Sequence, residues 1–192
     1  MRVFTGIELD PAVVRAGADL IDELARRATR QSPQARIAWV LPDRLHITVR
    51  FIGQTDDATY RRIQAAVSAP IDMPPFAVKI HALGSFPPRG APRVIWAGIG
   101  DDEARLSAVE REITARLSTV GVPPESRPYS PHLTLGRIKE ADGLKATALF
   151  QGLSGIVLGT TTVEAITLFE SRVSSKGAVY VPLLKTPLMP TS

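Results

Sequence analysis

Residues 45–53 read LHITVRFIG, and residues 131–138 read PHLTLGRI. Both stretches contain the pattern His, apolar residue, Thr, apolar residue, and two of the three histidines in the 192-residue chain begin it. Successive side chains of a strand point to opposite faces, so His and Thr share one face in each stretch while the apolar residues share the other. We therefore predict two half-buried strands, each of which holds an imidazole and a hydroxyl side by side.

These four polar side chains suit phosphoester hydrolysis without a metal. Histidine is the side chain that can serve as base in one copy and as acid in another near neutral pH, so His46 and His132 are the candidate catalytic residues. Thr48 and Thr134 can donate hydrogen bonds to non-bridging phosphate oxygens. We predict that the two strands face each other across one site, where one histidine takes a proton from water and the other protonates the departing oxygen.

Other sites have less support in the sequence. Zinc would need more ligands than two histidines, and the chain has no cysteine, although His81 is a possible third ligand. A Ser-His-Asp hydrolase lacks its Gly-x-Ser-x-Gly turn, and Ser130 near His132 is equally well explained as a turn residue. The phosphate-binding pattern Gly-x-x-x-x-Gly-Lys is also missing, which argues against hydrolysis of nucleoside triphosphates.

The composition predicts an ordinary globular protein. The chain is 44% hydrophobic and 22% charged, and its length is near that of one domain, so we expect residues 1–192 to form a single domain. The absence of cysteine, of a secretory h-region and of a long apolar run predicts a cytoplasmic protein that does not bind a membrane. The net charge of +4 is compatible with an anionic partner.

The hydrophobic periodicity predicts an α+β fold. Strands are expected at residues 2–9, 45–52, 76–83, 93–99, 132–138, 163–171 and 178–184. Helices are expected from Pro11, after an Asp10 N-cap, to about Arg30, between Asp56 and Ser68, and from residues 101–103 to about residue 119. Hairpins separate these elements rather than a strict strand-helix-strand alternation. A helix precedes a His-x-Thr strand in each half, which hints at a duplication.

The chain resembles the 2H phosphoesterase superfamily, and within it the RNA 2′,3′-cyclic phosphodiesterases, once called 2′-5′ RNA ligases. The resemblance covers nearly the whole chain. It is carried by residues 2–9 (RVFTGIEL), 45–53, 93–96 (RVIW), 127–137 (RPYSPHLTLGR) and 168–171 (LFES). The paired motifs are the most specific part of it.

The resemblance implies a bilobal 2H phosphoesterase fold with pseudo-two-fold symmetry, mostly antiparallel sheets flanked by helices, and a central cleft that holds both histidines. It implies hydrolysis of RNA 2′,3′-cyclic phosphate ends to 2′-phosphate, with no cofactor and no metal. His46 would protonate the 3′ oxygen and His132 would activate water. Thr48 and Thr134 would bind the phosphate together with Arg137, which matches a phosphate-contacting arginine of the family.

Strand alternation gives further expectations. By strand alternation alone, Arg137 would point to the face opposite His132. We expect a bulge at Gly136 to turn the Arg137 side chain to the face of His132. By the same alternation, Arg50 shares the strand face of His46. Phe51 lies on the face that points into the core, so it is not expected to stack on a base. Candidates for the nucleobase side are, in chain order, Trp39, Phe86 and Arg93.

Two other functions stay open at the level of sequence. One is a phosphodiesterase that acts on a small cyclic nucleotide rather than on an RNA end. The other is a non-catalytic RNA-binding module that keeps the cleft. The expected partner is RNA with a 2′,3′-cyclic phosphate end or a related nucleotide, and the protein is expected to act as a monomer.

Overall fold

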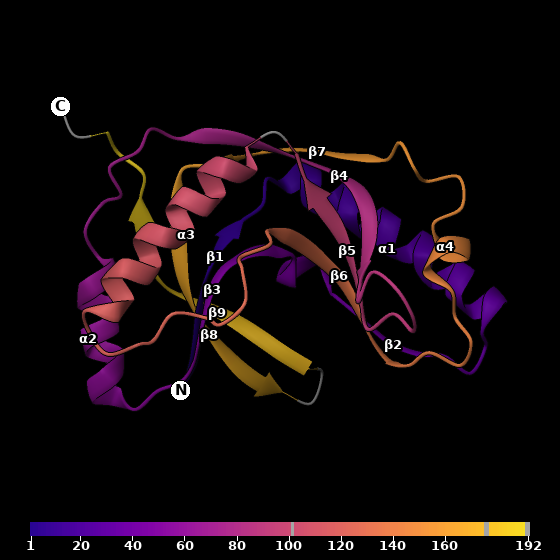
Figure 1. Cartoon of the computed structure of the whole chain (residues 1–192), viewed down its shortest axis with the longest axis horizontal. Helices are drawn as coiled ribbons and strands as arrows, with labels where there is room; N and C mark the ends of the chain where they lie inside the picture. Colours follow the sequence, from indigo (N-terminus) through magenta and orange to yellow (C-terminus); the bar gives the residue numbers. More distant parts are fainter. Residues whose placement is uncertain (101, 175–176, 191–192) are drawn as a thin grey trace.

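A curved antiparallel sheet carries the fold in the computed structural model, which describes residues 1–100, 102–174 and 177–190 (Figure 1). The strand order in this described part is β7-β4-β5-β6-β3-β1-β8-β9, and β2 also pairs with β6. The strands are β1 (Arg2–Glu8), β2 (Arg36–Trp39), β3 (His46–Gln54), β4 (Phe76–Phe86), β5 (Val94–Ile99), β6 (His132–Glu140), β7 (Val157–Val163), β8 (Ala165–Ser174) and β9 (Gly177–Pro187).

The helices cover the sheet in two groups. They are α1 (Pro11–Gln31), α2 (Asp57–Val67), α3 (Glu103–Ser118) and the short α4 (Ala146–Leu149), with a 3-10 turn η1 (Pro42–Arg44) before β3. Figure 1 shows α1 and α4 over the half that contains β4 to β7, and α2 and α3 over the other half. No helix in the described ranges is both long and apolar enough to span a membrane.

The two halves meet at the centre of the sheet, where β3 pairs with β6. In the described part of the chain the ladder between these strands is a single antiparallel pair, Ile47 opposite Leu133, and both residues are fully buried. Strands β7, β4, β5 and β6 lie on one side of this seam, and β9, β8, β1 and β3 lie on the other. The seam therefore brings the two His-x-Thr motifs into adjacent strands.

The expected duplication is visible in the connections. In the chain, helix α1 comes between β1 and β3, which are neighbours in the sheet. Helix α3 likewise comes between β5 and β6, which are also neighbours in the sheet. Each helix crosses to the opposite half, because α1 contacts β6 and β7 whereas α3 contacts β3. The predicted α+β class and pseudo-two-fold arrangement are confirmed.

Most of the predicted elements are present. Pro11 starts α1, but the carboxylate of Asp10 does not cap it and instead accepts a hydrogen bond from the Thr162 amide at 3.3 Å. Asp56 caps α2 by accepting from the Thr59 amide at 2.7 Å. Strand β7 was not predicted from the sequence. Residue 101 of the predicted third helix start lies outside the described residues, and α3 begins at Glu103.

Candidate active site

Four polar side chains lie together where β3 and β6 meet. Because Ile47 is opposite Leu133 in an antiparallel pair, His46 is opposite Thr134 and Thr48 is opposite His132. Ile47 and Leu133 point into the core, so the side chains on either side of them point to the other face. Each histidine is therefore next to the threonine of the other motif.

The backbone holds both imidazoles in the same way. Nδ1 of His46 lies 2.8 Å from the carbonyl oxygen of Arg44, and Nδ1 of His132 lies 2.8 Å from that of Ser130. A carbonyl only accepts, so each Nδ1 carries the proton and donates it. In the neutral ring this leaves Nε2 as the basic nitrogen. Nε2 of His46 lies 3.1 Å from Oγ1 of Thr48, within the site.

Aromatic side chains surround each histidine. The ring of His46 lies 5.0 Å, centroid to centroid, from those of Phe4 and Tyr180. The ring of His132 lies 5.2 Å from that of Phe86 and 6.4 Å from that of Trp96. Burial among these groups disfavours the charged imidazolium.

The pKa of both histidines is lowered. The largest cause in each case is burial, and the positive charge of Arg137 lowers the pKa of both rings as well. The charge of His132 further lowers the pKa of His46. The same guanidinium opposes protonation of both imidazoles, which links the two motifs electrostatically.

A β-bulge follows the threonine in each strand. In β6, Trp96 pairs with Thr134 and Ile95 with Gly136, so Leu135 is the extra residue. The Leu135 carbonyl accepts a hydrogen bond from the Val40 amide at 2.9 Å. The bulge reverses the alternation beyond it, and Arg137 lines the same cavity as Thr134. The extra residue is Leu135 rather than the predicted Gly136, but the predicted turn of Arg137 to the face of Thr134 is confirmed.

The bulge in β3 makes two sequence predictions wrong. Thr5 pairs with Arg50 and Gly6 with Thr48, so Val49 is the extra residue. Beyond it Phe51 turns to the cleft, where it is 48% exposed and lines the same cavity as His46. Arg50, predicted to share the face of His46, does not line that cavity. The alternation rule failed because it assumes a regular strand.

Arg50 instead holds the segment that leads into β6. Its side chain is 4% exposed, its Nη1 pairs with Glu125 at 2.6 Å, and its Nη2 donates to the Pro123 carbonyl. The hydroxyl of the partly buried Tyr129, from the same segment, donates to the Thr48 carbonyl at 3.0 Å. Burial raises the pKa of this phenol, which keeps it a donor. These contacts fix residues 123–129 against β3.

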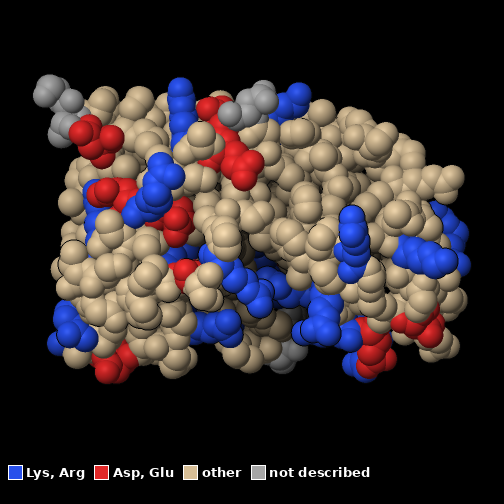
Figure 2. Space-filling view, viewed as in Figure 1, with Lys and Arg blue, Asp and Glu red and all other residues tan. Residues whose placement is uncertain are grey.

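A cavity of about 400 Å³ opens on this face, and we call it the main cavity. Figure 2 shows Lys and Arg side chains gathered around a hollow at the centre of the view. The main cavity contains three arginines, several aromatic rings and no carboxylate among its described lining residues, which are Arg2, Val3, Phe4, Val40, Arg44, His46, Thr48, Phe51, Thr134, Arg137, Ser171, Ala178 and Tyr180. Its charge suits an anion.

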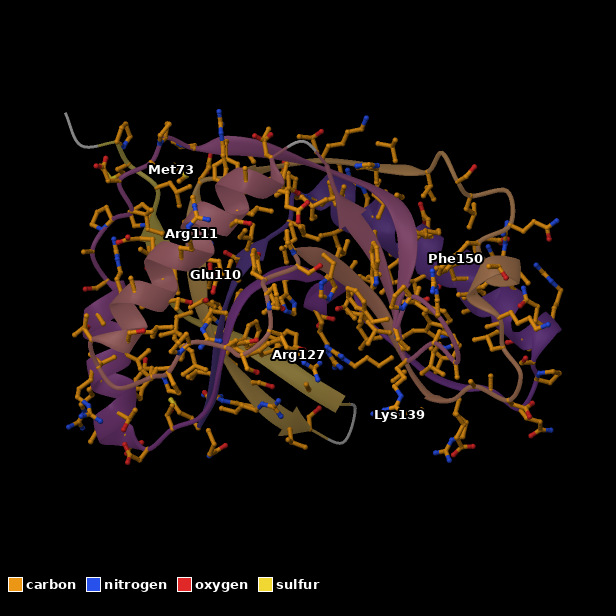
Figure 3. All side chains as sticks on the ribbon, in the orientation of Figure 1. Met73, Glu110, Arg111, Arg127, Lys139 and Phe150 are labelled. Atoms are coloured by element: carbon orange, nitrogen blue, oxygen red, sulfur yellow. The ribbon has the colours of Figure 1, made fainter. Side chains whose placement is uncertain are left out.

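A second cavity of about 190 Å³ lies on the His132 side. Thr48 and Phe51 line both cavities, so they stand between them. The second cavity has mixed charge, with Arg50 and Arg127 beside Glu110 and Glu125. In Figure 3 the labelled side chains of Glu110 and Arg127 mark this region.

The residues predicted for the nucleobase side, and the possible metal ligand His81, lie in different places. Phe86 contacts His132, as described. Trp39 packs against Gly136, where an added Cβ would lie 2.8 Å from its ring, and neither Trp39 nor Arg93 is among the lining residues of the two cavities. His81 lies on β4, two strands from His132, and no group of three or more potential metal-binding side chains of the His, Cys, Asp and Glu type occurs in the described residues.

Sequence reasoning missed Tyr180, Tyr129 and two arginines of the main cavity, Arg2 and Arg44. Tyr180 reaches His46 from β9, across more than 130 residues of chain, and no local pattern marks it. Arg2 belongs to residues 2–9, which predicted a strand and carried part of the family resemblance but marked no site residue.

Comparison with known proteins gives one family. The model of the 2′-5′ RNA ligase superfamily matches residues 14–174. An RNA 2′,3′-cyclic phosphodiesterase from Methanothermobacter thermautotrophicus is 30% identical over 186 residues, covering 95% of this chain and 96% of the relative. One from Aeropyrum pernix is 32% identical over 142 residues, covering 73% of this chain and 80% of the relative.

Solved structures show the same fold. TT0787 of Thermus thermophilus superimposes with a TM-score of 0.73 at 24% identity and full coverage of both chains. E. coli LigT complexed with 3′-AMP gives a TM-score of 0.73 at 21% identity, with 97% of each chain covered. With the matched family model and the paired motifs, the chain belongs to the 2′-5′ RNA ligase superfamily, the 2H phosphoesterases.

Proposed function

We propose that this protein is an enzyme that hydrolyses the 2′,3′-cyclic phosphate at an RNA end to a 2′-phosphate. The observation that carries the proposal is the pair of His-x-Thr motifs on one sheet face, each with Nδ1 bound to a carbonyl and Nε2 left for chemistry. Relatives that match nearly the whole chain are named RNA 2′,3′-cyclic phosphodiesterases, which supports the substrate.

The proposed roles follow an in-line displacement. Nε2 of His132 takes a proton from water as the water oxygen attacks phosphorus. The bond from phosphorus to the 3′ oxygen breaks, and His46 gives its proton to that oxygen, so the product carries a 2′-phosphate and a 3′-hydroxyl. Thr48, Thr134 and Arg137 stabilise the charge that builds on the phosphate oxygens.

The lowered pKa values of the two histidines decide when His46, the proposed acid, gains its proton. Both rings are disposed to be neutral near pH 7 in the free protein, because burial and Arg137 oppose protonation. A bound phosphate anion offsets the charge of Arg137 and favours the imidazolium. We propose that His46 becomes protonated when substrate binds.

We propose that residues 1–192 act as one bilobal domain, as a monomer in the cytoplasm, with an RNA end or related nucleotide as partner. The continuous sheet across the β3–β6 seam supports a single unit. The reaction as proposed uses side chains of this chain alone.

An oligonucleotide with a 2′,3′-cyclic phosphate, incubated with the protein in excess chelator, tests the proposal. We expect turnover that the chelator does not reduce, and a product with a 2′-phosphate. Loss of turnover with the chelator would contradict the metal-free reaction. A 3′-phosphate product would contradict the leaving oxygen, and no turnover under any condition would contradict the activity.

A further inference from the structure

We propose that Arg2 binds a phosphate upstream of the RNA end, so that the main cavity selects an oligonucleotide over a mononucleotide. This inference rests on the proposed function. Its starting point is an excess of positive charge: the described lining of the main cavity includes Arg2, Arg44 and Arg137 and no carboxylate. The phosphate that reacts already has Arg137 and two threonines, and Arg44 lies 3.9 Å from the carboxylate of Asp43, which leaves the charge of Arg2 to be explained.

Strand register places Arg2 away from the reacting phosphate. Along β1, Gly6 pairs with Thr48, Phe4 with Phe51 and Arg2 with Gln54. Four residues of strand therefore separate Arg2 from the level of Thr48, or about 13 Å. A ligand that contacts both positions must extend beyond its terminal phosphate.

The wall between these positions is aromatic. Phe4 and Phe51 lie with ring centroids 6.0 Å apart, and both line the main cavity. Phe51 is 48% exposed, so part of its side chain is accessible to a base. Aromatic rings next to cations are the usual means by which proteins bind single-stranded nucleic acid, because bases stack on the rings while the cations contact phosphates.

The charge of Arg2 is available for such a contact. Its side chain is exposed, and among the residues that the structure describes no carboxylate pairs with it. Another cation, Lys139, lies beside the hollow seen in Figure 2 (labelled in Figure 3), whereas Arg127 lies near the carboxylates of the second cavity. A longer RNA strand leaving the cavity would meet positive charge.

The test compares two substrates in the unmodified protein, two variants of Arg2 and one control variant. The specificity constant kcat/KM is measured for a 2′,3′-cyclic mononucleotide and for a trinucleotide with the same cyclic end, using the unmodified protein, Arg2→Gln and Arg2→Lys. Arg61→Gln removes the same charge from the exposed surface of α2 and is the matched control. Thermal unfolding checks that every variant is folded.

We expect Arg2→Gln to lower kcat/KM for the trinucleotide about 5- to 10-fold, as for the loss of one charged contact, and to leave the mononucleotide unchanged. Arg2→Lys should recover part of the loss. The slope of log kcat/KM against log salt for the trinucleotide should become shallower by about 0.7. An equal loss on both substrates, or no loss, overturns the upstream subsite. Failure of the unmodified protein on both substrates overturns the proposed function instead.

Discussion

Strand β3 presents His46, Thr48 and Phe51 to the cleft, and strand β6 presents His132, Thr134 and Arg137 at the same offsets. The position of the bulge, one residue after each threonine, is the same in both strands. The last of the three side chains differs: it is an aromatic ring in β3 and a cation in β6. The duplicated backbone thus supplies matching positions, while the side chain after the bulge makes one half suited to a base and the other to a phosphate.

The opposite face of the two strands shows a second difference. Arg50 and Gly136 occupy matching places after the bulge, and neither lines the main cavity. Arg50 binds Glu125 and Pro123, which fixes the segment before β6. Gly136 leaves room for the ring of Trp39. The two halves use the same backbone irregularity to hold different neighbours.

The largest expected effect tests the equivalence of the two histidines. His46→Ala and His132→Ala should each lower kcat on a cyclic-ended oligonucleotide by about 100-fold or more, because each loses one side of the acid–base pair. The double variant should lose much less than the product of the two factors, since the residues act as a unit. Steady-state rates provide the measurement, with His81→Ala as the control.

A single histidine variant that keeps most of its activity would contradict the equivalence of the two histidines. If one single variant loses much less than 100-fold, that histidine does not act as acid or base. A His81→Ala variant that is folded and equally impaired would remove the distinction between the paired histidines and the lone one.

The same comparison explains what the sequence could predict. His46, Thr48, His132 and Thr134 precede the bulge in their strands, so simple alternation placed them on one face correctly. Gly136 signalled the bulge in β6, and this led to the correct placement of Arg137. The matching position in β3 is Arg50, which carries no such signal, so Phe51 and Arg50 were assigned to the wrong faces. Tyr180 reaches His46 only through the tertiary fold.

A smaller effect is expected at Gly136. Gly136→Ala would place a Cβ 2.8 Å from Cε3 of Trp39, so the ring or the strand must move. We expect a loss of about 1–3 kcal/mol in the free energy of unfolding, as for other overpacked sites, and lower activity because Arg137 is displaced. Urea denaturation measures the first effect and steady-state kinetics the second.

Trp39→Leu supplies the matched control for that prediction. A smaller side chain at position 39 makes room for the new methyl group, so the double variant should lose less stability than the sum of the single variants. Strict additivity of the two losses would mean that the contact with Trp39 is not the reason for glycine at position 136.

The smallest effect concerns the influence of Arg137 on both halves. Proton NMR titration of a chain with three histidines resolves the rings individually, and the single histidine variants assign the signals. The pKa of His46 and that of His132 should both lie below 6.5. In Arg137→Met both should rise, because a nearby positive charge that opposes protonation is gone, and both should stay below 6.5, because burial is the larger cause and remains.

The linked effect on folding has a definite sign. Below about pH 6.5 the unfolded chain binds protons that the buried rings do not yet accept, so the free energy of unfolding falls as the pH is lowered through this window. The fall should be shallower in Arg137→Met, whose rings accept protons at higher pH. If only one imidazole responds to the substitution, Arg137 serves one motif alone. In that case the two halves share a backbone pattern without sharing the charge that couples their chemistry.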